Sequence, residues 1–138
     1  MSDERGTRLS EETEVLLRQV HPKFFACGRI SSQAFEAPPS HAGKLSVDRE
    51  ALTTAREAFE LYTDGFGRES AGVCGVTVGE VHGLELEAYE NPIEESAEHP
   101  ADPAHAVIDL SGLSRSKMKS TAGKLAREAR ERGMIYQP

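Results

Sequence analysis

A group of polar side chains near the start of the chain has the composition of a phosphate-binding site. Arg18, His21, Arg29, Ser31 and Ser32 lie within fifteen residues of one another. Arginine forks and serine hydroxyls are donors that phosphate oxygens accept. No glycine-rich turn between a strand and a helix accompanies them, so a second interpretation stays open. In it, Arg18 meets the C-terminus of a helix and Arg29 is a solvated turn residue.

Serine and histidine residues also supply groups for nucleophilic or acid–base catalysis. Ser32 and Ser46 carry candidate hydroxyls, and His21 and His105 are candidate bases. A base must lie within hydrogen-bond reach of its nucleophile, which spacing alone does not decide. Because no GxSxG, HExxH or Walker A sequence is present, backbone hydrogen bonds in turns explain the serines equally well. These four residues and Arg18 remain candidates, expected to line one shallow polar site.

The chain offers few ligands with the spacing of a metal site. The two cysteines, Cys27 and Cys74, form no CxxC pair, and no two histidines have the i, i+4 spacing of a helical zinc site. His99 and His105 flank Asp102, an arrangement that two solvated loop histidines explain as well. We therefore expect no metal, no cofactor and two free thiols, as is usual in a cytosolic protein.

The chain is acidic, and its charge is unevenly distributed. Its 138 residues carry a net charge of −7, with 38% hydrophobic and 28% charged residues, a composition typical of one globular domain. Eight acidic and no basic residues lie between positions 80 and 102. Repulsion from such a surface disfavours general binding to nucleic acid. The chain shows no hydrophobic leader and no apolar run of roughly 20 residues, so we expect a cytoplasmic protein without membrane contact.

Basic residues gather at the other end of the chain. Residues 113–138 carry a net charge of +5, which leaves −12 on the rest. A helix is predicted there, beginning after Ser111 or Ser114 and ending before Gly133. We expect its basic side chains to bind a protein partner; they are Arg115, Lys117, Lys119, Lys124, Arg127 and Arg130. The alternative is a helix that only covers the sheet, with basic residues that complement its C-terminus.

The remaining elements follow from periodicity and turn residues. A mobile tail over 1–9 precedes a helix over 10–20, and a packed, irregular loop covers 21–43. Ser46 or Asp48 is expected to cap a helix over 49–63. Strands are predicted over 44–47, 70–81, 84–90 and 105–110, with a short helical piece over 79–83. Residues 10–138 are thus expected to form one α+β domain: a mixed sheet of about four strands, packed by two or three helices.

Several short motifs between residues 16 and 110 resemble a group of short bacterial proteins. The shared pattern is an Arg-x-x-x-Pro, a Ser-Ser-x-Ala-Phe, a Leu-Ser-Val and a late Pro-Ala-His-Ala. Here it begins at Arg18, Ser31, Leu45 and Pro103, and the basic helix lies outside it. An Asn-Pro associated with the last motif is displaced to position 91, and Asp-Pro stands in its place. The group implies no activity; its motifs mark positions to test.

Three functions follow as expectations, of which the third is a nucleic-acid-binding protein that uses the C-terminal helix and loses binding steeply as salt rises. The first is a non-catalytic module that binds another protein through the basic helix, encoded beside a larger enzyme in a bacterial defence, toxin or mobile-element operon. The second is a small enzyme acting on a nucleotide or nucleic-acid phosphate, with His21 and His105 as acid and base and Arg18 on the phosphate. The second requires these three residues to converge in a cleft.

Overall fold

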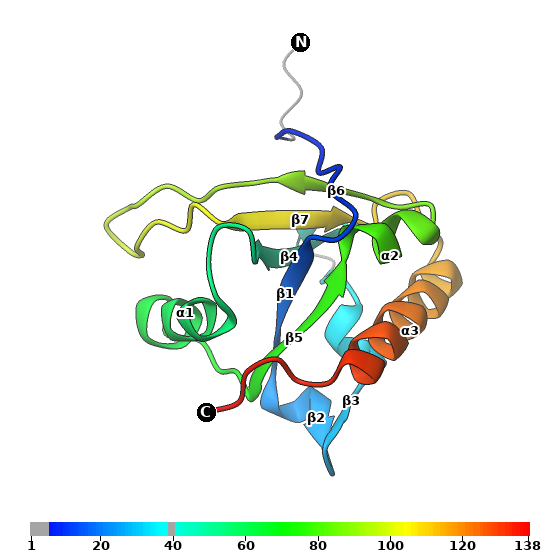
Figure 1. The fold of residues 1–138 in the computed structure, drawn as a ribbon, viewed down its shortest axis with the longest axis horizontal. Coiled ribbons are helices and arrows are strands. Elements are labelled where there is room, and N and C mark those ends of the chain that lie inside the picture. Colours follow the sequence, from blue (N-terminus) through cyan, green and yellow to red (C-terminus); the bar gives the residue numbers. More distant parts are fainter. Residues whose placement is uncertain (1–5, 39–40) are drawn as a thin grey trace.

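An antiparallel sheet of five strands forms the centre of the molecule in a computed structural model that describes residues 6–38 and 41–138 (Figure 1). The strand order is β5-β1-β4-β7-β6. The strands are β1 (Val15–Val20), β4 (Lys44–Arg49), β5 (Gly72–Thr77), β6 (Glu87–Glu90) and β7 (His105–Asp109). The single α+β domain is confirmed. The predicted mixed sheet of about four strands is corrected, since five strands pair and each pairing is antiparallel.

The extra strand is β1, which replaces the helix predicted over 10–20. β1 lies between β5 and β4 and is buried on both faces: Leu16 and Val20 enter the main core, whereas Leu17 packs in a second cluster on the opposite face. A central strand with two buried faces has consecutive apolar residues, which resemble one turn of a buried helix. The acidic residues that precede β1 favour the first turn of a helix. The pairing of β1 with β4 and β5 outweighs this local preference.

The main core lies between the sheet and the C-terminal helix α3 (Arg115–Arg132). Ser114 caps this helix, and Gly133 follows it with φ 84°, so both predicted ends are confirmed. Ala122, Leu125, Ala126 and Ala129 are fully buried against the sheet. The helix is thus part of the core and does not extend away from the domain. The short helix α2 (Val78–Gly83), also predicted, covers the same face.

The opposite face carries a shorter helical unit. Figure 1 shows α1 (Ala55–Glu60) on the other side of the sheet from α3, and a π-helical turn, η4 (Leu61–Gly65), follows it directly. The helix predicted over 49–63 is confirmed from Ala55 onward, but its predicted start and cap are wrong, because Ser46 and Asp48 belong to β4 and Thr54 caps α1. Since α1 packs on β1 and β5, the neighbouring strands β4 and β7 are left without a helical cover on this face.

The loop after β1 is packed, as predicted for residues 21–43, of which 39 and 40 lie outside the described residues. It contains the 3-10 turns η1 (Pro22–Phe24) and η2 (Ser32–Phe35) around a small hairpin of β2 (Phe25–Ala26) and β3 (Arg29–Ile30). Ile30, Ala34 and Phe35 are buried in the main core. The apolar residues of this irregular segment therefore hold it against α3 and the sheet.

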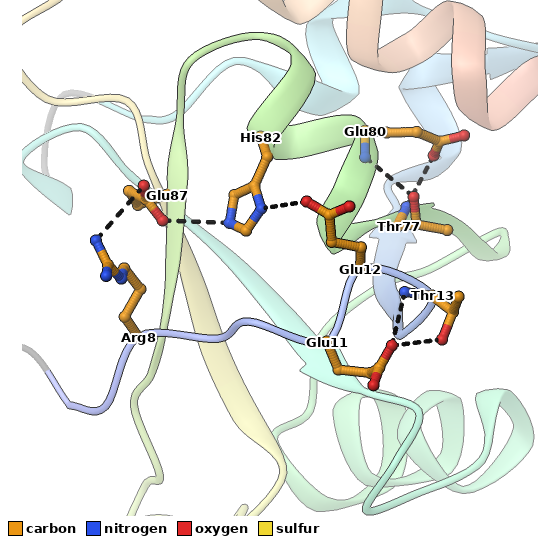
Figure 2. Close-up of polar contacts among 8 residues, drawn as sticks. All are labelled: Arg8, Glu11, Glu12, Thr13, Thr77, Glu80, His82 and Glu87. Carbon is orange, nitrogen blue, oxygen red and sulfur yellow. Dashed lines mark hydrogen bonds and ion pairs between the residues drawn. The ribbon is translucent and has the colours of Figure 1, made fainter.

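The chain that enters β1 runs along the outer strand β6. Residues 1–5 of the predicted mobile tail lie outside the described part, but the Leu9 side chain is buried and its amide donates to the Ala88 carbonyl. Figure 2 shows the His82 ring between two carboxylates, each 3.2 Å from a ring nitrogen: Glu12 and Glu87. These contacts tie the segment to α2 and β6.

Candidate functional site

A cavity of about 300 Å³ lies on the face of the sheet that α1 covers only in part. Its floor consists of side chains from β1, β4 and β7, and its walls come from α1, η4 and the loop between β6 and β7. Gln19, Ser46, Asp48, His105 and Val107 contribute to the floor. These side chains lie on the same face of the sheet because every second residue of a strand points to the same side. The floor of the cavity is therefore built on the three central strands of the sheet.

Asp48 and His105 face each other across two strands of this floor. They are direct partners in the antiparallel pairing of β4 with β7. Directly opposed residues have Cβ atoms about 4.5–5.5 Å apart. The sheet thus places a carboxyl group beside an imidazole at the bottom of a cavity. Asp102, in the loop before β7, lies beside both and hydrogen bonds to the Asp48 side chain.

Asp48 is set up to carry a proton at neutral pH. Burial, followed by the hydrogen bond to Asp102 and the charge of that group, raises the pKa of Asp48 to about 8. Its Oδ1 is buried and has no hydrogen-bond partner among the described residues. Asp102 is held in place because its backbone pairs with Ile93 in both directions and its Oδ1 accepts from the Ala104 amide at 3.2 Å. Its position beside Asp48 favours the protonated form of the Asp48 carboxyl group.

His105 is set up to be neutral. Its Nδ1 lies 2.7 Å from the Asn91 carbonyl oxygen, which can only accept, so Nδ1 carries the hydrogen and Nε2 carries the lone pair. Burial lowers the pKa of His105, and the cations Arg68 and His41 act in the same direction, against the Asn91 carbonyl and Asp102. At neutral pH, the cavity therefore holds a carboxylic acid opposite an imidazole that can accept a proton.

Arg18 supports this floor from between two strands. β1 and β4 pair only at Leu16 with Arg49 and at Leu17 with Asp48. Beyond this point the Arg18 guanidinium bridges the strands: Nε donates to the Ala34 carbonyl at 2.8 Å and Nη1 donates to the Ser46 carbonyl at 2.9 Å. Burial lowers the pKa of Arg18, although a guanidinium stays charged in proteins. We assign Arg18 as a positioning residue.

The five residues predicted as catalytic candidates fall into two groups. Arg18, Ser46 and His105 line the cavity. His21 does not: it caps η1 by accepting from the Lys23 amide, and its Nε2 lies 3.7 Å from Glu69. Ser32 lies elsewhere, in an open groove beside Arg29 and Arg130. The polar cluster predicted near the start of the chain is thus divided between separate surfaces.

Two important side chains of the cavity, Asp48 and Arg68, are not among the predicted site residues. The sequence pattern predicts only a helix cap at Asp48 and no role for Arg68. One sequence signal points to Asp48: it is an acidic residue within the alternating strand Lys44–Arg49. Its side chain lies on one face of the sheet, where it could contribute to a site. Its burial comes from the loop that carries Asp102, far along the chain. Arg68 follows the π-helical turn, a local geometry that is frequent at functional sites.

The six predicted partner-binding residues lie on α3, and five of them are exposed. Arg130 differs, because it is half-buried and its Nε donates to the Ile30 carbonyl at 2.7 Å. Arg127 lies 3.9 Å from Glu131 of the same helix. Over residues 6–38 and 41–138, no ion pair joins the remaining four to a carboxylate. Four basic side chains therefore point into solvent.

Both thiols are free: Cys27 is exposed and Cys74 is buried. Within the described part of the chain, no group of three or more histidine, cysteine or carboxylate side chains is arranged to hold a metal ion. No described helix combines the length and apolar character that crossing a membrane requires. The fold and the cavity define a class, a small α+β domain with an acid and a base on an open sheet face. No protein-family model, curated protein or solved structure matches the chain.

Proposed function

We propose that the protein is a small enzyme that catalyses proton transfer on a ligand bound in the cavity. The observation that carries this proposal is the direct pairing of Asp48 with His105 across two strands, where burial raises the pKa of the acid and lowers that of the imidazole. Environments that push the pKa values of two neighbouring groups apart assign one group as acid and the other as base. In this protein the carboxyl group is the acid and the imidazole is the base, the reverse of their ordinary order in water.

In the proposed reaction, His105 Nε2 removes a proton from one substrate atom while Asp48 donates its proton to another. One bond to hydrogen breaks and one forms, so the substrate is isomerised without an oxidant or a co-reactant. The turnover leaves an imidazolium and a carboxylate, which exchange protons with water before the next cycle. Positioned acids and bases of this kind each contribute about 10²- to 10⁴-fold to a rate. Asp102 acts by keeping the proton on Asp48.

This proposal keeps His105 from the sequence-based enzyme hypothesis and changes two roles. His21 has no part in it, because its side chain caps η1. Arg18 supports the floor through two backbone carbonyls and is not assigned to a phosphate. A cavity of about 300 Å³ lies at the lower end of the range for small-molecule sites. The proposed substrate is therefore a small molecule, and a nucleic-acid strand is disfavoured.

The test is a pH profile of proton exchange in deuterated water. Small metabolites are incubated with the enzyme, and loss of substrate C–H signals is followed by proton NMR. We expect exchange to fall below the pKa of His105, which lies under its ordinary 6.5, and again above about 8, where Asp48 loses its proton. His105→Gln should reduce the rate about 100-fold or more, whereas His82→Gln, outside the cavity, should not. Titration of Asp48 near 4 in a carboxyl carbon NMR experiment would contradict the proposal.

A second candidate function is binding to an acidic protein through the exposed side of α3. The supporting observation is the row of basic side chains without carboxylate partners, on a helix whose apolar side is already buried in the core. Such a partner would be held by charge and not by apolar contact. Association would then weaken as salt rises.

Neutralising this surface tests the second candidate. The variant changes Arg115, Lys117, Lys119 and Lys124, the four side chains without a carboxylate partner among the described residues, to Gln together. We expect the partner complex to be lost while the free energy of unfolding changes by less than about 1 kcal/mol, because exposed substitutions have small effects. Affinity purification from the host at low and high salt provides the readout, with Lys23→Gln as the control. Complex formation by the fourfold variant as strong as in the wild type would rule this surface out.

A further inference from the structure

We infer that the ligand of the cavity is a small organic anion whose carboxylate or phosphate group is bound at the mouth by Arg68. This inference deepens the proposed function and shares its cavity. It assigns the substrate class, whereas Asp48 and His105 supply the chemistry. It rests on three features: the cations around the mouth, the way in which Arg68 is held, and the apolar wall behind it.

Basic side chains from separate segments line the mouth of the cavity. His41 and Lys44 come from the start of β4 and the residues before it, and Arg68 follows η4. His41 and Arg68 are exposed, and Lys44 is half-buried. Throughout the described part of the chain, none of the three forms an ion pair with a carboxylate. In a protein with a net charge of −7, an opening lined by the cations Arg68 and Lys44 favours an anionic ligand.

Arg68 is held in place before any ligand binds. Its guanidinium carbon lies 5.7 Å from the ring centroid of Tyr62 and 5.7 Å from that of Phe66. Phe66 stacks in turn on His99 at a centroid distance of 5.2 Å. A guanidinium above aromatic rings keeps the N–H groups at its edge free to bind a carboxylate or phosphate with two hydrogen bonds. Because Arg68 occupies these two rings, they are assigned to the arginine and not to stacking on a nucleobase.

The mouth lies within electrostatic reach of the base. The charges of Arg68 and His41 act on His105 and lower its pKa. A bound anion therefore offsets part of the lowering of the His105 pKa. It also fixes the charged end of the ligand on one side of the acid–base pair. Asp48 adds little repulsion, since it is protonated at neutral pH. The protonated Asp48 therefore does not oppose an anionic group at the mouth.

The wall between the mouth and the floor is suited to an organic body. Ala58, Leu61 and Ile93 line it, from α1, η4 and the β6–β7 loop, and Leu17 and Val107 add apolar surface from the floor. Few polar groups combined with apolar walls are the usual composition of small-ligand sites. The ligand class is therefore an anion with a short apolar or weakly polar chain, in contrast to a free inorganic ion.

Binding of matched four-carbon probes tests the inference. Butyrate and butyl phosphate carry the anion, butanol lacks it, and butylammonium reverses the charge; inorganic phosphate lacks the chain. Calorimetry should detect at least one of the two organic anions and neither butanol nor butylammonium, with inorganic phosphate binding more weakly. The comparison of butyrate with butyl phosphate decides which acid the site prefers. Equal affinity for butanol and for the better anion would overturn the inference.

Two arginine variants provide the matched control. Arg68→Gln should lower anion affinity about 10-fold or more, the effect of losing a charged hydrogen bond, whereas Arg56→Gln on the exposed side of α1 should not. Anion binding should also raise the pKa of His105 in the wild type, and this rise should disappear in Arg68→Gln. Equal binding by both variants would overturn the inference. A pKa of Asp48 near 4, measured separately, would instead overturn the proposed function, so that the two failures are distinguishable.

Discussion

Replacing Asp48 by asparagine is expected to stabilise the fold at pH 8 by about 2–4 kcal/mol, and to reduce proton exchange on the substrate at least about 100-fold. The folded-state pKa of Asp48 is about 8, far above the ordinary value of an exposed aspartate. A raised pKa means that the folded state binds the proton more tightly than the unfolded state. Below about pH 4 both states are protonated, and the stabilising effect of the proton is fully present.

As the pH rises from about 4 to about 8, the wild-type protein loses this stability, and above about 8 the loss is constant. Asparagine imitates the protonated acid, since its amide donates to Asp102 without a charge to bury. The advantage of Asp48→Asn should therefore grow over this pH range. Such a gain in stability with a loss of activity is typical of functional groups held in unfavourable surroundings.

Urea unfolding of both proteins at pH 4, 6 and 8 measures this difference. Asp64→Asn is the control, because Asp64 is an exposed carboxylate in the adjacent helical unit and should change stability by less than about 0.5 kcal/mol at each pH. A difference between Asp48→Asn and the wild type that does not vary with pH would show that Asp48 is ionised in the folded protein. The assignment of Asp48 as the acid would then be wrong.

Arg18→Met should destabilise the protein by about 2–4 kcal/mol, because it leaves two backbone carbonyls without their charged donor. Ala34 belongs to η2 and Ser46 to β4, so the single guanidinium joins these segments to β1. Methionine keeps much of the side-chain volume, which separates the lost hydrogen bonds from a loss of packing. Arg18→Lys should have an intermediate effect, since an ammonium lacks the planar fork that meets two carbonyls at once.

Urea unfolding and calorimetric binding of the four-carbon anions distinguish the two roles considered for Arg18. Arg56→Met provides a matched substitution at an exposed position of α1. A positioning residue predicts a loss of stability in Arg18→Met, with binding restored when the variant is kept folded at low temperature. Unchanged stability with a complete loss of binding would instead make Arg18 a ligand-binding group, as the sequence-based enzyme hypothesis had it.

Local sequence signals were sufficient where an element depends mainly on its own residues. β5 and β7 are clusters of β-branched and small apolar residues between turn signals, and both were predicted. α3 has a serine cap, an apolar stripe and a terminal glycine, so both of its ends were also predicted. By contrast, β1 was predicted as a helix, because the periodicity of its short apolar run does not distinguish a central strand from a buried turn of helix.

The candidate site shows the same division. The sequence by itself determined that His105 follows a proline-broken loop into a buried strand, which placed a titratable ring at the edge of the core. Only the tertiary structure decided that Asp48 lies opposite this ring, that Asp102 keeps Asp48 protonated, and that His21 is elsewhere. The physical reason is that strand register and burial depend on residues more than fifty positions apart, and the protonation of a side chain follows from that burial.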